Sequence, residues 1–456
     1  MAGDWLDRRF RERPDSGYAG GSLSEAWQRW RASRLARLLL RAASASRWYR
    51  QRLEAGLAAR LAGRLRRGRP EEFPSLLAEL PFTGPEDLAA DSDAFLAVGQ
   101  GRVAGVVSVP TSGTSGRSKR VYSTAADLEE TVSFFEYGMR FLVSPGRDRV
   151  ALAMSAARPG NVGDLLGRAL ARWQIPFLAH GFVPAGTAEE ESWLAGLLAW
   201  KPSCLVGVPP QMLSLVRHPR GAALAGTLRT LLLSGEVADD RLVAELEKSL
   251  PGGRVFRHYG LTETGLGGAV ECGRRNWPHL RDDLWAEIIG PDGAPRPDGQ
   301  SGELVVTPLT RLGMPLLRYR TGDEARLLSE PCPCASIFPR LEVFGRLSDR
   351  LTLGGRSLRV SDFEEPLLAL PFVRDFSLTL RSEKPPELDL RLNVTPGTPP
   401  EAAAAAVSAL KRWLGEDGGR VKLNLELSLI RENDPAAARA LGGKRRLARG
   451  AAETRA

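Results

Sequence analysis

A run of nine residues, Thr111 to Lys119, consists of small hydroxyl residues and glycines and closes with basic residues. It follows the apolar stretch Val103 to Val109, which predicts a strand whose carboxyl end opens into the run, as ligand-binding loops do in α/β sheets. Glycines let the backbone approach phosphate oxygens, and successive N–H groups form an anion-binding concavity. The lysine adds a mobile positive charge. We therefore predict a loop that binds the phosphate chain of a nucleotide, formed by Thr111, Ser112, Gly113, Thr114, Ser115, Gly116 and Lys119.

The spacing of this run differs from the Walker pattern G-x-x-x-x-G-K-[ST]. Lys119 comes three residues after Gly116, and Arg120 follows it where the Walker pattern has a hydroxyl residue. The magnesium ligand must therefore lie elsewhere in the chain. A flexible Ser/Gly linker is the alternative interpretation, but a linker rarely follows a strand directly and ends in Lys-Arg.

Three later segments carry residues suited to the rest of a nucleotide. In His258 to Gly265, Tyr259 offers a flat ring for a purine, and Thr262 offers a hydroxyl for a phosphate. Glu263 offers a hard oxygen ligand for magnesium. In Arg318 to Asp323, the acid after a glycine turn could accept both hydroxyls of a ribose, and a further basic turn follows at Gly345 to Arg350. Each segment alone is also compatible with an ordinary turn.

The four cysteines are too few for a disulfide framework in a chain of 456 residues. Cys272 and His279 are separated by six residues, and Cys332 and Cys334 form a C-x-C pair. Three thiols and one imidazole can complete the closed tetrahedral shell of structural zinc. Unpaired thiols with a surface histidine, or redox chemistry at the C-x-C pair, are the alternatives. Cys204 lies in an apolar run, which indicates packing.

The net charge of +9 is concentrated in one segment, because residues 26–69 hold thirteen arginines and a single acid, Glu54. Apolar residues recur there at helical intervals, which predicts amphipathic helices with arginine on the solvated face. Attraction to RNA, to a membrane or to CoA phosphates is the alternative. No run is long enough to span a membrane, and the amino terminus lacks the apolar core of a secretory signal. A cytoplasmic location is expected.

Helical and strand-like segments alternate through the first three quarters of the chain, which favours an α/β architecture. The strand-like runs at 150–154, 204–208 and 228–233 are almost continuously apolar, as expected for strands buried on both faces. Helices are predicted between them, at 126–141, 163–173, 190–200 and 239–250. The length of the chain favours two or more domains.

Further segments complete a recognisable order of motifs: 48–53, 80–83, Gly207-Val208-Pro209-Pro210, Ser234-Gly235-Glu236, 270–272 and 442–444. With the segments above, these make the chain resemble the superfamily of adenylate-forming, AMP-binding enzymes, and more closely the phenylacetate-CoA ligase family. The resemblance covers nearly the whole chain. It implies that a carboxylate attacks the α-phosphate of Mg-ATP to give an acyl-adenylate and pyrophosphate, after which the thiol of CoA displaces AMP.

The resemblance also implies roles for individual residues. The loop 111–119 would hold the β- and γ-phosphates, and Lys444 would bridge the attacking carboxylate and the α-phosphate, where negative charge develops. Glu263 would bind magnesium, and the cysteine and histidine positions match those of some relatives, which supports zinc. Thr262 would contact the α-phosphate, and the remaining nucleotide contacts would come from Ser234, Gly235, Glu236, Tyr259, Gly260, Asp323 and Arg346.

The same resemblance implies a large multi-layer domain with mostly parallel sheets, at 1–344, which includes the basic segment 26–69. A small mobile α+β domain would follow at 345–456, with a hinge near Ser348 and Asp349. The acyl pocket would be lined by Phe134, Phe135, Tyr137 and Gly207, which suits an aryl acid. Residues 155–160 lack the glycine- and aromatic-rich composition usual in phenylacetate-CoA ligases, which argues against phenylacetate itself.

The expected partners are a small carboxylic acid and CoA, with no nucleic acid and no membrane, and a homodimer is left open. Two other functions remain to be distinguished. One is adenylyl transfer without CoA, as in deazaflavin-cofactor or polysaccharide-associated relatives, and the other is a non-catalytic relative. Intact Glu263, Asp323 and Lys444 argue against the second.

Overall fold

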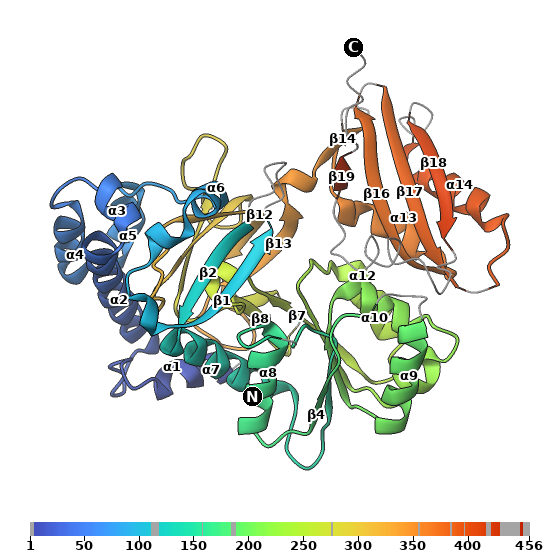
Figure 1. Ribbon diagram of the computed structural model, residues 1–456, viewed down its shortest axis with the longest axis horizontal. Helices are drawn as coiled ribbons and strands as arrows, with labels where there is room; N and C mark the ends of the chain where they lie inside the picture. Colours follow the sequence, from blue (N-terminus) through green and yellow to red (C-terminus); the bar gives the residue numbers. More distant parts are fainter. Residues whose placement is uncertain are drawn as a thin grey trace. The chain divides into compact units, whose positions relative to one another are not determined.

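The computed structural model describes residues 4–110, 118–156, 158–183, 188–274, 277–353, 356–383, 385–395, 397–415, 421–428 and 447–449 (Figure 1). The chain forms two compact units, each built from several segments. Unit 1 comprises residues 1–145, 156–175 and 258–343, and unit 2 comprises residues 146–155, 176–257 and 344–456. None of the helices is both long and apolar enough to cross a membrane, as far as the described residues go.

The first hundred residues of unit 1 are mainly helical. Ser22 caps the longest helix by accepting a hydrogen bond from the Glu25 amide, and the buried face of this helix packs against α4. The elements are α1 (Asp4–Glu12), α2 (Leu23–Ala45), α3 (Arg47–Arg52), α4 (Leu57–Arg67), η1 (Pro70–Glu72), α5 (Phe73–Ala78), α6 (Pro85–Ala90), η2 (Ser92–Phe95) and η3 (Gln100–Arg102).

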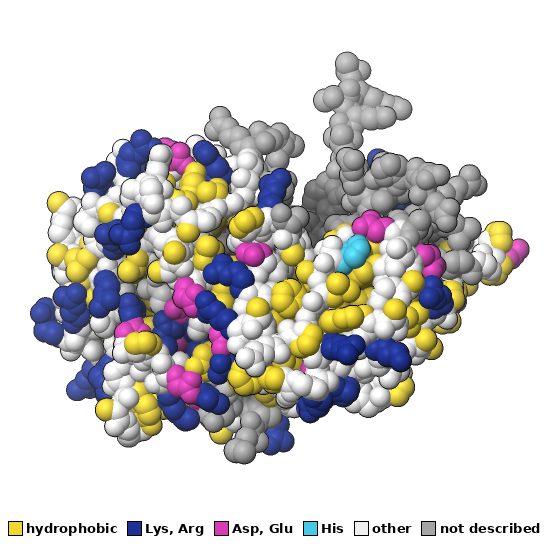
Figure 2. Space-filling view, turned by 60° about the horizontal axis from the view of Figure 1, so that its bottom comes forward, with side chains coloured by type: hydrophobic (Ala, Val, Ile, Leu, Met, Phe, Trp, Pro, Cys, Tyr) yellow, Lys and Arg dark blue, Asp and Glu magenta, His cyan; other side chains and the backbone are white. Residues whose placement is uncertain are grey.

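These helices place most of the predicted arginine segment at the surface. Figure 2 shows basic side chains, in dark blue, over the part of the surface that the first helices occupy. Arg31 is an exception, because it lies over the ring of Trp285 at 3.6 Å and the ring of Trp27 at 4.6 Å, where burial lowers its pKa to about 9. Six exposed arginines form no ion pair with any residue that the structure describes: Arg37, Arg50, Arg52, Arg66, Arg67 and Arg69.

The rest of unit 1 is built on antiparallel strands. β1 (Val103–Pro110) and β2 (Ser118–Thr124) pair with each other, and α7 (Ala125–Leu142) follows, capped by Thr124. A separate set of strands has the order β10-β11-β12-β13-β9-β8. Its members are β8 (Ala269–Glu271), β9 (Pro278–Leu280), β10 (Leu284–Ile289), β11 (Gly302–Pro308), β12 (Tyr319–Leu328) and β13 (Arg340–Arg346), whose last three residues belong to unit 2. Unit 1 also contains α8 (Val162–Arg172) and η4 (Thr262–Thr264).

The first part of unit 2 is a parallel sheet covered by helices. Its strands follow the order β6-β5-β3-β4, and three of them consist entirely of buried residues, as their continuous apolar character predicts. The elements are β3 (Val150–Leu152), β4 (Phe177–Ala179), α9 (Ala188–Trp200), β5 (Cys204–Gly207), α10 (Pro209–Val216), α11 (Gly221–Ala225), β6 (Thr230–Ser234) and α12 (Asp240–Lys248). β7 (Arg254–Tyr259) leads on into unit 1.

The last part of unit 2 is a small α+β fold with a four-stranded sheet in the order β18-β17-β16-β19. The pairs β17–β18 and β16–β19 are parallel, whereas β16–β17 is antiparallel. Its elements are η5 (Leu347–Asp349), β14 (Leu351–Leu353), β15 (Arg356–Leu358), η6 (Val360–Phe363), α13 (Glu364–Leu368), β16 (Val373–Glu383), β17 (Pro386–Val394), α14 (Ala402–Leu414), β18 (Lys422–Ser428) and β19 (Leu447–Arg449).

Both parts of unit 2 contribute to one hydrophobic core cluster. A buried ion pair also joins them, because Arg374 on β16 donates to Glu190 on α9 at 2.7 Å and to the Ser214 carbonyl at 3.1 Å. The two charged side chains are 1% and 2% exposed. Arg217 donates in addition to the Leu368 carbonyl at 2.6 Å.

The α/β class and the small α+β fold after residue 344 are confirmed. The predicted strand 103–109 is confirmed as β1, but it pairs only with β2, in a two-stranded antiparallel sheet. It is therefore not a strand of the parallel sheet, whereas the prediction of a phosphate-binding loop assumed that the loop follows a strand of an α/β sheet. The division at 344/345 and the mobility of the carboxy-terminal part stay predictions.

Candidate functional site

Three side chains from separate segments of unit 1 meet at one buried point. Lys119, on β2, forms an ion pair with Glu263, which lies in the short helix η4. Tyr319, at the start of β12, donates its hydroxyl hydrogen to Glu263 Oε1 at 2.7 Å and accepts a hydrogen bond from Lys119 Nζ at 3.2 Å. The predicted phosphate lysine and the predicted magnesium ligand are therefore in direct contact.

The charge state of Glu263 follows from these contacts. Burial by itself would raise the pKa of this carboxyl, because a low-dielectric interior disfavours the charged form. The ammonium of Lys119 and the Tyr319 hydroxyl outweigh burial and hold the pKa below its ordinary value. Glu263 is therefore an anion at neutral pH, as a ligand for a hard cation must be.

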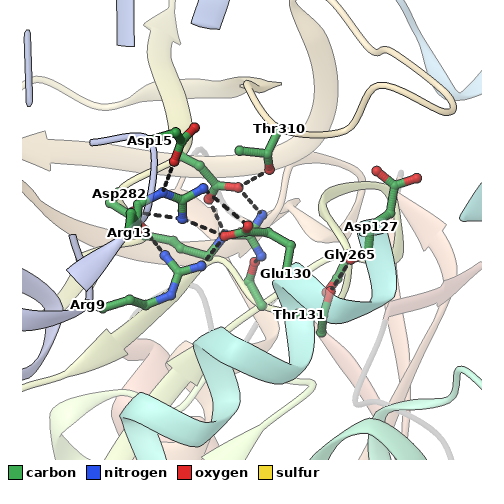
Figure 3. Close-up of polar contacts among 12 residues, drawn as sticks. Arg9, Arg13, Asp15, Asp127, Glu130, Thr131, Gly265, Asp282 and Thr310 are labelled. Carbon is green, nitrogen blue, oxygen red and sulfur yellow. Dashed lines mark hydrogen bonds and ion pairs between the residues drawn. The ribbon is translucent and has the colours of Figure 1, made fainter. Parts of the chain in front are cut away.

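The backbone around Glu263 is fixed by close contacts at two glycines. A Cβ on Gly260 would lie 1.8 Å from the Leu266 carbonyl oxygen, so only glycine fits there. Gly265 has φ of +83°, and its carbonyl accepts a hydrogen bond from Thr131 on α7 at 2.8 Å (Figure 3). The segment that contains Thr262 and Glu263 is thus held at both ends.

A buried charged cluster lies beside this segment. Figure 3 shows Arg9 and Arg13, from α1 and the residues after it, joined to Glu130 on α7 and to Asp282. The distances from Arg13 Nη1 to Glu130 Oε1 and to Asp282 Oδ2 are 2.6 and 3.1 Å. The neighbouring Arg281 donates to the carbonyls of Thr264 at 3.0 Å and Gly267 at 2.8 Å, so a buried guanidinium also supports the Glu263 segment.

A second pair of predicted nucleotide residues is also in contact. Tyr259, the last residue of β7, donates its hydroxyl hydrogen to Asp323 Oδ2 on β12 at 2.7 Å. Asp323 is buried, and the predicted purine and ribose residues therefore lie side by side in unit 1.

The predicted zinc ligands come together in unit 1. The ligand atoms of Cys272, His279, Cys332 and Cys334 all lie within 4.8 Å of one another. The distance between the sulfurs of Cys272 and Cys332 is 3.7 Å. A tetrahedral centre with Zn–S bonds of about 2.3 Å separates two sulfurs by roughly 3.8 Å. The cluster therefore has the dimensions that zinc requires.

The imidazole of this cluster is oriented as metal-binding histidines are. His279 Nδ1 donates to the Phe338 carbonyl at 2.7 Å, which leaves Nε2 facing Cys334 Sγ at 3.3 Å. A hydrogen bond from Cys272, helped by His279, lowers the pKa of Cys334. A tight turn places the two cysteines of the C-x-C pair, because the Ala335 amide donates to the Cys332 carbonyl at 2.8 Å.

The other predicted nucleotide residues lie in unit 2 or outside the described residues. Ser234 ends β6, and Gly235 follows with φ of +88° and with Val208 and Met154 as its neighbours. Glu236 comes next, Arg346 ends β13, and Gly207 ends β5. The residues outside the described ranges are Thr111, Ser112, Gly113, Thr114, Ser115, Gly116 and Lys444.

The predicted aromatic pocket residues on α7 have different surroundings. Phe134 and Phe135 are buried, and both contact the ring of His258, with centroid distances of 6.2 and 5.9 Å. Burial lowers the pKa of His258 to about 4, so the ring is neutral at physiological pH. Tyr137 instead donates its hydroxyl to Glu12 on α1. A role for these residues in an acyl pocket stays a prediction.

Sequence reasoning assigned no role to Tyr319 or Arg281. Tyr319 stands inside the motif that contains Asp323, so its position in the motif was an available signal. Arg281 carried no signal, because an arginine beside two aspartates resembles an exposed charged turn until its burial is known.

The chain matches the AMP-binding enzyme family over residues 106–308. It is 30% identical over 334 residues to a phenylacetate-coenzyme A ligase of Thermus thermophilus, across 69% of this chain and 71% of the relative. The chain belongs to the AMP-binding, phenylacetate-CoA ligase-like family. Another member, the phenylacetate-coenzyme A ligase of Escherichia coli, is 28% identical over 66% of this chain and 68% of its own length.

Solved structures support the fold of this family member. A 2-hydroxyisobutyryl-CoA ligase in the postadenylation state superimposes with a TM-score of 0.69 and 19% identity, over 94% of this chain and 96% of the other. An anthranilate CoA ligase superimposes with a TM-score of 0.53 and 13% identity, over 96% and 95% of the two chains.

Proposed function

We propose that the chain activates an organic carboxylic acid with ATP, forms an acyl-adenylate with release of pyrophosphate, and transfers the acyl group to the thiol of CoA with release of AMP. The observation that carries the proposal is the contact among Lys119, Glu263 and Tyr319 in a member of this family. This contact supports the proposal, because a lysine suits a phosphate and an anionic carboxylate suits magnesium.

Each group of residues has its own role in the proposed reaction. Tyr259 and Asp323 hold the nucleoside, with Ser234, Gly235, Glu236, Gly260 and Arg346 as further contacts. Thr262 binds the α-phosphate, and the loop 111–116 and Lys119 bind the other phosphates. Glu263 holds Mg²⁺, which when bound neutralises phosphate charge as pyrophosphate leaves.

Lys444 completes the proposed adenylation centre. Its ammonium lies between the attacking carboxylate and the α-phosphate and stabilises the negative charge that develops there. In the proposed reaction the carboxy-terminal part moves between the two half-reactions and carries Lys444 to and from the centre, which requires its core contacts and the Arg374–Glu190 pair to separate. The acid is held against Phe134, Phe135, Tyr137 and Gly207, and an aryl acid suits these side chains.

Zinc is the proposed occupant of the cysteine and histidine cluster. Three sulfurs and one imidazole nitrogen make a closed shell without a position for substrate, which indicates a structural role. The ion would fasten β9 to the segment between β12 and β13. A cytoplasmic location and a homodimer stay predictions.

Acid-dependent exchange of pyrophosphate into ATP tests the proposal. A library of carboxylic acids is screened with Mg²⁺, and CoA is then added to the acids that support exchange. We expect AMP and an acyl-CoA thioester only when CoA is present. Exchange without CoA-dependent AMP release would instead support adenylyl transfer without CoA, and retained exchange in Lys444→Ala would remove that lysine from the mechanism.

A further inference from the structure

Two segments with no role in the reaction above meet at a buried point just before the start of β12. Tyr49 belongs to α3, and Thr83 lies in the connection between α5 and α6. Both side chains are fully buried, and both contact Leu317, two residues before Tyr319.

Three hydrogen bonds close a ring at this point. The Leu317 amide donates to Tyr49 Oη at 2.7 Å, and Thr83 Oγ1 donates to the Leu317 carbonyl at 2.9 Å. Tyr49 Oη and Thr83 Oγ1 are 3.0 Å apart. The threonine has a single hydroxyl hydrogen, which it gives to the carbonyl, so the tyrosine donates to the threonine. Burial raises the pKa of Tyr49 far above its ordinary value, so the hydroxyl keeps the hydrogen that the ring needs.

The backbone of Thr83 continues the attachment past Tyr319. The Thr83 amide donates to the Arg318 carbonyl at 3.1 Å, and the Arg320 amide donates to the Thr83 carbonyl at 2.8 Å. These two bonds bracket Tyr319 as a parallel bridge. Arg318 has φ of +47°, a conformation that costs free energy for a residue with a Cβ and that the surroundings must hold in place.

Arg318 has its own restraints. Its guanidinium donates to Glu287 Oε1 at 3.0 Å and to the Leu80 carbonyl at 3.0 Å, and it lies over the ring of Phe82 at 4.1 Å. Leu80 and Phe82 therefore hold the side chain of Arg318, while Thr83 holds its backbone. The direction in which the Tyr319 side chain points from the start of β12 depends on both restraints on Arg318.

We propose that Tyr49 and Thr83 are positioning residues for the magnesium ligand. They hold residues 317–320 so that the Tyr319 hydroxyl meets Glu263 Oε1 and Lys119, and they set the affinity for Mg-ATP without touching the nucleotide. This inference rests on the proposed function of the same site.

The test compares hydroxyl deletions with matched controls. Tyr49→Phe and Thr83→Val remove one hydroxyl each with little change of shape, and Thr83→Ser retains the hydroxyl. Ser46→Ala is the control for lost stability, because Ser46 precedes the same helix, is fully buried, and donates to the Ala94 carbonyl at 2.9 Å, away from β12. Thermal unfolding sets the temperature of the assays, which stays well below the midpoint of every variant.

Binding of ATP is measured by calorimetry with Mg²⁺ and, separately, with EDTA; neither measurement needs the acid. We expect Tyr49→Phe and Thr83→Val to weaken Mg-ATP binding about fivefold, the equilibrium effect of roughly one lost hydrogen bond. Binding in EDTA should change little, and Thr83→Ser and Ser46→Ala should bind Mg-ATP as the parent does.

Parent-like Mg-ATP affinity in Tyr49→Phe and Thr83→Val would overturn the inference, and so would an equal loss in Ser46→Ala. A parent protein that binds no Mg-ATP would overturn both the inference and the proposed function. Normal Mg-ATP binding with no exchange for any acid would count against the proposed function alone.

Discussion

Replacing Lys119 with methionine tests the charge balance at Glu263. Methionine keeps most of the side-chain length but removes the ammonium from a carboxylate that is only 4% exposed. Removing one partner of a buried ion pair costs about 3–5 kcal/mol. A carboxyl group escapes part of this cost by taking up a proton, so the pKa of Glu263 in the variant rises above its ordinary value because burial is no longer offset by the ammonium.

The contribution of Glu263 to the free energy of unfolding changes with pH in opposite directions in the parent and in Lys119→Met. In the parent, the pKa of Glu263 lies below the ordinary value of 4.5, so its stabilising contribution is present above that pH and is lost as the pH falls through the folded-state pKa. In Lys119→Met the folded-state pKa lies above the unfolded one. Stability is then lost as the pH rises through that window, by about 1.4 kcal/mol per pH unit.

Calorimetric unfolding of nucleotide-free protein at pH 5, 6, 7 and 8 measures the difference. The variant should be close to the parent near pH 5 and less stable by about 3 kcal/mol at pH 7. Lys248→Met is the control, because Lys248 is 74% exposed and pairs with Glu245 at the surface. A difference in stability between the variant and the parent that stays the same from pH 5 to pH 8 would refute the reasoning. Adding Glu263→Gln to Lys119→Met should abolish the pH dependence.

Three further predictions concern other contacts. Purified protein should contain about one zinc per chain by elemental analysis, and the Cys334→Ser variant should lose most of this zinc. A metal-free parent that unfolds at the same temperature as zinc-supplemented protein would contradict the prediction. Glu190→Gln should destabilise unit 2 by about 3 kcal/mol in denaturant titrations, whereas Glu190→Leu with Arg374→Met should stay near the parent; equal loss in both would speak against a buried charge as the cause. Tyr319→Phe should lower the rate of pyrophosphate exchange about tenfold by freeing the Glu263 carboxylate, and an unchanged rate would exclude the hydroxyl.

Candidate site residues could be proposed from the sequence where the residue types themselves suit a chemistry. Glu263 follows a strand and a glycine, and the cysteines have ligand spacing, so both were predicted from local pattern. The cores of β3, β5 and β6 were also predicted, because continuous apolar runs indicate burial on both faces, whereas the exposed strand β4 was not. Strand ends moved by a few residues, as for the predicted 228–233, which is β6 at Thr230–Ser234.

The pairing of β1 was not predictable in the same way. An apolar strand before a polar loop fits either a parallel sheet or a hairpin, and the choice depends on β2, whose Ser118 to Thr124 reads as part of the loop and its flank. The partners of Tyr319 and Arg281 were likewise set by contacts with distant segments. Burial decides whether such an arginine is a surface charge or a support for a loop, and burial is a property of the whole fold.

The ring of hydrogen bonds among Tyr49, Thr83 and Leu317 has a consequence for the evolution of the sequence. Losing the hydroxyl of Tyr49 leaves an amide without its acceptor, and losing that of Thr83 leaves a carbonyl without its donor. Losing both hydroxyls leaves the amide and the carbonyl of Leu317 unpaired together, because neither backbone group can itself be replaced. Among homologous enzymes, the tyrosine and the threonine at these two positions should therefore be retained together.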